Sequence, residues 1–194
     1  MHFSDFFAIL INSLAGHLKI LDIIMILISK TAPYILMLIT LISYIYGLFK
    51  GNDKLKLTAI NTVVKTFIAI TLSQIIGYIM PLSRPFVNNE RIKLLYPHEA
   101  NASFPSDHSL GCMSLALGLN KYNSRFNKLY IGLAILTGFS RIYVAHHYPL
   151  DVVGGFVIAM FVGKLYDKYV SNVIEHIYIK VEQLLKLNKI KKTC

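Results

Sequence analysis

Long apolar runs place the strongest limit on how this chain can fold. Residues 33–49 read PYILMLITLISYIYGLF and contain no charged side chain. Inside a bilayer, backbone N–H and C=O groups must bond within their own segment, so runs of this kind predict transmembrane helices. Only 15% of the 194 residues are charged, whereas soluble domains contain about 25%. We therefore predict one all-α domain embedded in a membrane.

The apolar runs predict a polytopic helical bundle of about five to six transmembrane helices. After the run above, four more spans are expected at residues 58–80, 106–119, 129–144 and 150–167. Residues 3–29 are apolar but carry several polar side chains, and we expect two short interfacial helices there, with a tilted span as the alternative. Pro33 then predicts the start of a new helix, because proline is favoured in the first turn.

The C-terminal segment has a different pattern. Between residues 171 and 192, apolar side chains recur at helical spacing among Glu, Lys and Gln, and lysines gather at the end. This pattern predicts an amphipathic helix that lies on the inner leaflet. The single domain, 1–194, is thus divided into interfacial helices (1–30), a catalytic bundle (31–170) and a basic tail (171–194).

The formal net charge of +10 has two readings. It could attract nucleic acid, but in a membrane protein lysines and arginines mark cytoplasmic loops and contact anionic lipids. Most of the 20 basic residues lie in the short loops 50–56 and 120–128 or follow the last span. We expect that side to be cytoplasmic, no nucleic acid to bind, and the polar segments 84–108 and 140–151 to face outward.

The second of these outward segments contains an oriented imidazole. His147 and Asp151 are four residues apart, which places them one helical turn from each other. A carboxylate there can hold the imidazole in one tautomer and stabilise its cation, which makes the ring a nucleophile or a base. Pro149 begins the following helix and fixes the turn.

The first outward segment supplies anion-binding groups. His108 lies one turn into a predicted helix whose free N–H groups and dipole favour phosphate, and Ser106 adds a hydroxyl donor. Arg84 and Arg141 add planar forks that fit phosphate oxygens. Together with the oriented imidazole, these are the parts of a metal-free phosphoryl-transfer site, which works by positioning and charge stabilisation.

Each cluster also has a structural interpretation. Arg84-Pro85 could tether a loop, Ser-Asp-His is an ordinary helix cap, and His146 and His147 could be interfacial histidines or metal ligands. The functional interpretation rests on their combination, because buried Arg, His and Asp are costly in a membrane without a role.

The motifs resemble those of the type-2 phosphatidic acid phosphatase superfamily. The third motif of that family, Ser-Arg-x5-His-x3-Asp, is met by Ser140, Arg141, His147 and Asp151. The second, Pro-Ser-Gly-His, appears at 105–108 with Asp107 in place of Gly. The first, Lys-x6-Arg-Pro, keeps Arg84-Pro85 but has Gly77 in place of Lys. The sequences around the second and third motifs, SFPSDH and LTGFSRIYVAHHYPLD, resemble more specifically those of bacitracin-resistance-type undecaprenyl-diphosphatases.

The resemblance implies a role for each motif residue. His147 is the implied nucleophile, which forms a phosphohistidine, and Asp151 orients it. His108 is the implied acid and then base. The implied substrate-binding residues are Arg84, Pro85, Ser106, Asp107, Ser140 and Arg141.

The resemblance also implies the cellular setting. A multi-pass protein of the bacterial plasma membrane is expected, with its site on the extracytoplasmic side, a polyprenyl diphosphate and membrane lipids as partners, and no metal or cofactor. Other lipid phosphates (phosphatidylglycerophosphate, phosphatidic acid or a lipid A phosphate), a non-enzymatic lipid-binding scaffold and a homodimer stay open.

Two positions depart from the family pattern. The missing lysine leaves one phosphate contact without a residue, and Arg91, Lys93 and His98 in the outer loop are the candidates. Asp107 is electrostatically unfavourable beside phosphate and is expected to point away or pair with a cation. Lys65, inside the second span, is expected to extend its ammonium toward the inner end of its helix, with a functional buried lysine as the alternative.

Overall fold

The structure is a computed structural model that describes residues 3–121 and 126–184. All regular structure in these two segments is helical. The helices are α1 (Phe3–Asn12), α2 (Lys19–Phe49), α3 (Asp53–Ile79), α4 (Pro85–Asn88), α5 (Asp107–Asn120), α6 (Asn127–Tyr143), α7 (Pro149–Tyr169) and α8 (Ser171–Leu184).

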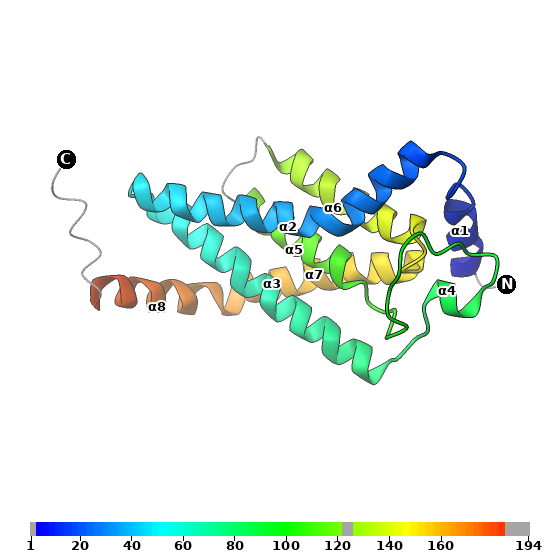
Figure 1. Ribbon diagram of the computed structural model, residues 1–194. Coiled ribbons are helices and arrows are strands. Elements are labelled where there is room, and N and C mark those ends of the chain that lie inside the picture. Colours follow the sequence, from blue (N-terminus) through cyan, green and yellow to red (C-terminus); the bar gives the residue numbers. More distant parts are fainter. Residues whose placement is uncertain (1–2, 122–125, 185–194) are drawn as a thin grey trace.

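Helix α5 is the centre of the bundle, and α2, α3, α6 and α7 pack around it (Figure 1). The main core includes Leu36 of α2, Leu110 and Leu115 of α5, and Val162 of α7. A methyl group added at Gly118 would lie 2.2 Å from the Thr62 hydroxyl oxygen, so α5 can approach α3 closely only with glycine there. The small residues of the sequence therefore serve helix packing, as expected for a membrane bundle.

Apolar side chains also cover the outside of the bundle. Leu38 is 55% exposed and Phe67 is 71% exposed, on α2 and α3 respectively. Exposed apolar surface of this extent is unusual for a soluble monomer and is normal where lipid is the solvent. The protein is a membrane protein.

Among the described residues, three helices are long and apolar enough to cross a bilayer: α2, α3 and α7. The expected five to six spans are therefore not reached by this criterion. Helices α5 and α6 have 14 and 17 residues, or roughly 21 and 26 Å at 1.5 Å per residue, which is less than the ~30 Å hydrocarbon core. Helix α5 lies inside the bundle, where neighbouring helices cover most of its surface. Helix α6 packs against α5 and α2 on one side and exposes apolar side chains such as Leu129 and Ile135 on the other.

The expected helix start at Pro33 is wrong. Helix α2 runs without interruption from Lys19 to Phe49 and includes Pro33, so only α1 is a separate short helix at the N-terminus. Proline removes one backbone hydrogen bond, but membrane helices tolerate this loss when neighbours support the helix. Ala32 and Leu36, on either side of Pro33, are fully buried in the core.

Helix α8 is amphipathic in sequence, but it packs against the bundle on one side. Its Glu182 pairs with Lys56 in the first turn of α3, and Figure 1 shows α8 extending past α7 beside that part of α3. Residues 185–194, which complete the predicted basic tail, lie outside the described residues.

Helix α1 is fixed to the loop between α3 and α5 and to the end of α6. The Asn12 side chain donates to the carbonyl oxygens of Lys93 (3.0 Å) and Tyr143 (2.8 Å) and accepts from the Lys93 backbone N–H (2.7 Å). These bonds hold the loop between α3 and α5 over the start of α5 and the end of α6, on the right in Figure 1. The histidine and arginine motifs meet at this end.

Candidate active site

A polar pocket of about 590 Å³ lies between the last turns of α3, the first turn of α5 and the loop 81–106. Its polar lining includes Arg84, His98, Asp107, His108, Arg141 and His147. Residues from all three sequence motifs thus line one pocket, although Arg84 and His147 are more than 60 positions apart in the sequence. We call it the histidine pocket.

His147 is held in one tautomer by the backbone. Its Nδ1 lies 2.8 Å from the carbonyl oxygen of Ser103. A carbonyl oxygen only accepts, so Nδ1 must carry the proton. Nε2 then carries the unprotonated lone pair, which accepts a hydrogen bond from Nη1 of Arg84 (3.2 Å). The atom available as a nucleophile is therefore Nε2.

Asp151 acts beside this bond and makes no direct hydrogen bond to the imidazole. Its Oδ2 is 3.6 Å from Nδ1 of His147, which is ion-pair range but too long for a hydrogen bond. The same oxygen accepts from the Ser103 hydroxyl and from the Tyr148 backbone N–H. Asp151 thus positions Ser103, and Ser103 positions His147. The sequence expected the direct contact and gave no role to Ser103.

The turn that presents His147 requires an unusual backbone. Ala145 has φ of 74°, in the left-handed region that non-glycine residues seldom adopt. The backbone N–H groups of His146 and His147 both return to the carbonyl oxygen of Arg141 (3.0 and 3.3 Å). This tight turn lets α6 end and α7 begin within a few residues.

Arg84 is fully committed to protein acceptors. Its guanidinium donates to the carbonyl oxygens of His146 (2.7 Å) and Ala102 (3.0 Å), twice to the Asn101 side chain (2.7 and 3.0 Å), and to Nε2 of His147 (3.2 Å). It therefore ties the loop between α3 and α5 to the turn that carries His147. Sequence analysis did not identify Asn101.

Some guanidinium donors of Arg141 have no partner among the described residues. Its side chain is 1% exposed, and Nη1 donates to the hydroxyls of Ser29 (3.0 Å) and Tyr96 (2.9 Å). Its Nε and Nη2 have no hydrogen-bond partner in the described part of the chain. Buried guanidinium donors without partners are costly, and this pair borders the histidine pocket. Such a fork fits two oxygens of one phosphate.

His108 and Asp107 enter the pocket from the first turn of α5. Both line it, and the Ser73 hydroxyl of α3 donates to Asp107 Oδ1. Asp107 therefore lines the pocket and pairs with a neutral hydroxyl, whereas the sequence left open that it points away or pairs with Arg84 or a loop cation.

Three expected substrate-binding residues do not line the histidine pocket. The Ser106 hydroxyl pairs with Ser109 (2.9 Å), and the Ser140 hydroxyl donates to the Thr137 carbonyl (2.7 Å). Pro85 is buried at the start of α4. All three have structural positions beside the pocket, because the turns of α4, α5 and α6 direct their side chains into the packed bundle.

Of the three candidates for the missing lysine contact, His98 alone lines the pocket. Arg91 is exposed, and the Lys93 ammonium lies against Gly16. His98 meets the ring of His146 edge-on, with centroids 4.3 Å apart, and its Nδ1 faces the Glu99 carbonyl oxygen (3.0 Å). Gly77, the position of the family lysine, borders the same pocket.

The comparison with protein families matches residues 58–175, more than half of the chain, to the PAP2 superfamily. The chain belongs to the PAP2 superfamily. This confirms the family expected from the three motifs.

Named relatives agree. The chain is 32% identical over 159 residues to undecaprenyl-diphosphatase BcrC of Bacillus subtilis, covering 82% of this chain and 80% of that protein. It is 31% identical to the putative undecaprenyl-diphosphatase YbjG of Escherichia coli, over 70% of this chain and 66% of the relative.

Two solved structures share the fold. LpxE of Aquifex aeolicus matches with a TM-score of 0.65 and 25% identity, covering 84% of this chain and 93% of LpxE. A PAP2-type phosphatidylglycerolphosphate phosphatase of Bacillus subtilis matches with a TM-score of 0.60 and 23% identity, covering 86% and 84%.

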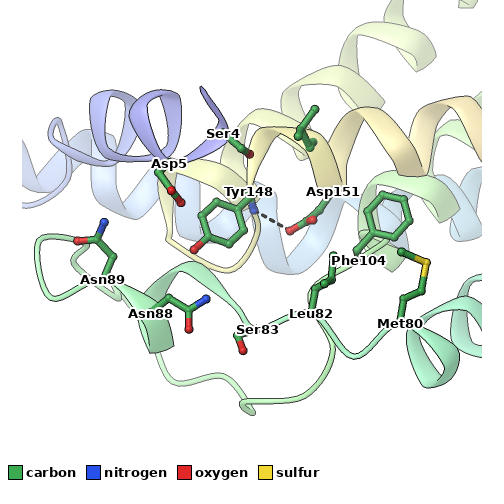
Figure 2. A pocket seen from close by; sticks show the side chains of 11 residues that line it. Ser4, Asp5, Met80, Leu82, Ser83, Asn88, Asn89, Phe104, Tyr148 and Asp151 are labelled. Carbon is green, nitrogen blue, oxygen red and sulfur yellow. Dashed lines mark hydrogen bonds between the residues drawn. The ribbon is translucent and has the colours of Figure 1, made fainter. Parts of the chain in front are cut away.

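A second pocket, of about 510 Å³, adjoins the site of this PAP2 protein (Figure 2). It lies between α1, the end of α3 and the start of α7, and Phe104 lines both pockets. Asp151 also borders it, with the bond from the Tyr148 N–H drawn in Figure 2. Asp151 thus lies beside His147 and lines this second pocket, whereas His147 lines the histidine pocket.

Burial and the nearby arginines keep His146 and His147 neutral. Burial, followed by the guanidinium groups of Arg141 and Arg84, holds the pKa of His147 well below its ordinary value. Burial, followed by Arg141, lowers the pKa of His146 to about 2. A neutral His147 has its Nε2 lone pair available near neutral pH, as a nucleophile requires.

The same shifts predict loss of stability in acid. A histidine with a lowered pKa binds its proton only in the unfolded state between its two pKa values, so stability falls as pH drops below about 6.5. For His146, which is packed between Tyr96 and His98 and beside Arg141, the loss from pH 7 to 5 should be about 2 kcal/mol. Thermal unfolding in detergent should therefore depend less on pH in His146→Asn than in wild type.

The matched control is His176→Asn, which removes an exposed histidine of α8. Its unfolding temperature should follow the wild-type pH dependence. Equal pH dependence in His146→Asn and wild type would contradict the prediction.

Proposed function

We propose that this PAP2 protein hydrolyses undecaprenyl diphosphate to undecaprenyl phosphate and phosphate, through a phosphohistidine on His147. The observation that carries the proposal is the pairing of an oriented Nε2 with the unpartnered donors of Arg141 in one pocket. The names of the relatives from Bacillus subtilis and Escherichia coli favour this lipid over others.

In the first step, the terminal phosphate places its oxygens on Arg141, and Arg84 adds charge beside them. His147 Nε2 attacks the phosphorus, a P–N bond forms, and the anhydride P–O bond breaks. The leaving undecaprenyl phosphate takes a proton from His108. In the second step, His108 removes a proton from water, the hydroxide oxygen attacks the phosphorus, and the P–N bond breaks to release phosphate and His147.

We further propose that the histidine pocket faces the extracytoplasmic side of the plasma membrane. The connection between α2 and α3, the start of α3, the end of α5 and the start of α6 lie at the opposite end of the bundle. They carry Lys50, Lys54, Lys56, Lys121 and Lys128, which favours a cytoplasmic position. A thiol reagent that cannot cross the membrane should modify Cys introduced at Arg91 in intact cells. Modification only after the cells are opened would overturn this orientation.

Phosphate release from a panel of lipids tests the activity. Purified protein should release phosphate from undecaprenyl diphosphate faster than from phosphatidylglycerophosphate, phosphatidic acid or a lipid A phosphate, and a chelator should not reduce the rate. The structural likeness to LpxE and to the phosphatidylglycerolphosphate phosphatase makes their lipid classes the competing substrates. A higher kcat/KM for any of the other lipids would overturn the substrate, and loss of activity with chelator would overturn the metal-free mechanism.

The leaving group predicts unequal effects of the two histidines. A leaving phosphate needs less protonation than an alkoxide, so His108→Ala should lose only about 10²-fold in kcat, near the lower end for general acid–base groups. His147→Ala should lose far more. Equal and complete loss in both folded variants would contradict the division of roles.

A further inference from the structure

A polar pocket of about 410 Å³, separate from the two pockets described above, lies toward the opposite end of the bundle. It is formed by the first half of α3, the end of α5 and the start of α8, and its lining includes Lys54, Thr58, Asn61, Lys65, Lys121 and Ser171. Lys65 is 12 residues before Gly77 of the histidine pocket, or about 18 Å along α3. We call this site the lysine pocket.

Lys65 is buried without adequate neutralisation. It is 3% exposed, and the nearest carboxylate oxygen, Oδ1 of Asp167, is 3.9 Å from its Nζ. No hydrogen bond joins its ammonium to any residue the structure describes. An ammonium has three donors, and leaving them unbonded in a membrane bundle is costly.

The one carboxylate within reach is shared. Asp167 Oδ2 lies 2.6 Å from the ammonium of Lys121, while Oδ1 has no hydrogen-bond partner among the described residues. Lys65 and Lys121 therefore share this one carboxylate. Lys54 and Glu175 also line the pocket, and Asp53 pairs with Lys56 (3.0 Å), which Glu182 also contacts.

The position of the pocket identifies the chemistry of its ligand. Helix α5 ends at Asn120 and α7 at Tyr169, so the mouth of the pocket lies where helices reach the bilayer surface. Lipid phosphates occupy that level, and lysines there attract anionic headgroups. A phosphate oxygen would supply a hydrogen-bond acceptor for the Lys65 ammonium.

We propose that the lysine pocket binds the phosphate group of an anionic membrane lipid, held by Lys65 and Lys121. The occupied pocket joins α3, α5 and the α7–α8 junction, so lipid binding stabilises this end of the bundle. The site is separate from the histidine pocket and does not depend on the proposed reaction.

Thermal unfolding of the full chain with added lipid tests the proposal. Phosphatidylglycerol, a phosphodiester with no terminal phosphate to remove, should raise the unfolding temperature by about 4 °C or more, and phosphatidylcholine should not. Native mass spectrometry should show one retained phosphatidylglycerol. Both effects should be lost in Lys65→Met, in which an apolar side chain of similar length replaces the buried charge.

Lys121→Met is the second variant, because Lys121 is half exposed and its loss leaves the core intact. Lys128→Met is the matched control: it removes an exposed lysine near the same end, at the start of α6, and should respond like wild type. A full phosphatidylglycerol effect in both pocket variants would overturn the site. An equal shift with inorganic phosphate alone would assign the pocket to free phosphate and overturn the lipid as its source.

Discussion

Replacing His147 with alanine should reduce phosphate release from undecaprenyl diphosphate by roughly 10⁴-fold or more, the scale seen when a catalytic nucleophile is removed. The reason is geometric. Nδ1 of His147 carries the proton that it donates to the Ser103 carbonyl oxygen, so Nε2 is the ring nitrogen with the unprotonated lone pair. His108 belongs to a different helix and cannot supply an equally oriented atom.

Chemical trapping separates this role from a structural one. With a substrate carrying a labelled terminal phosphate, His108→Ala should accumulate acid-labile label on the protein, because water activation is slow. His147→Ala should show no label, although it elutes as a folded protein in size-exclusion chromatography. Label retained on His147→Ala, or more than a tenth of the wild-type rate, would remove His147 from the nucleophile role.

Replacing Arg141 with lysine should reduce kcat by about 10²- to 10³-fold, the usual loss when one preorganised donor to a developing anion is removed. Lysine keeps the charge but not the fork, and the two donors of Arg141 that lack protein partners are those of the fork, Nε and Nη2. Steady-state kinetics on undecaprenyl diphosphate measures the effect, with KM expected to change less than kcat.

Tyr96→Phe is the matched control for Arg141. It removes one hydroxyl that holds Nη1 but leaves the Ser29 contact and both free donors in place. We expect a loss of less than about 10-fold, in line with a neutral hydrogen bond. If Arg141→Lys kept wild-type kcat, the phosphate would have to bind elsewhere, and Arg84 would be the remaining guanidinium in the pocket.

The positions of many helices could be predicted because they follow from local patterns of apolar and polar residues. The spans expected at 106–119, 129–144 and 150–167 correspond closely to α5, α6 and α7. The helix boundary at Pro33 was wrong because the packing of Ala32 and Leu36 outweighs a local signal. Lys65 shows the same limit: its ammonium was expected to extend toward the inner helix end, and only the packing of α3 and α7 shows that the carboxylate nearest to it is shared with Lys121.

By itself, the sequence determined that the chain is an all-helical membrane protein and that His108, Arg141, His147 and Asp151 belong to one family pattern, because hydropathy and motif spacing are local properties. Only the tertiary structure decided how they work together. Ser103 fixes the His147 tautomer from 44 positions away, and Tyr96 and Ser29 hold Arg141 from 45 and 112 positions away. Hydrogen bonds across such separations depend on how helices pack, and no spacing rule in one sequence encodes them.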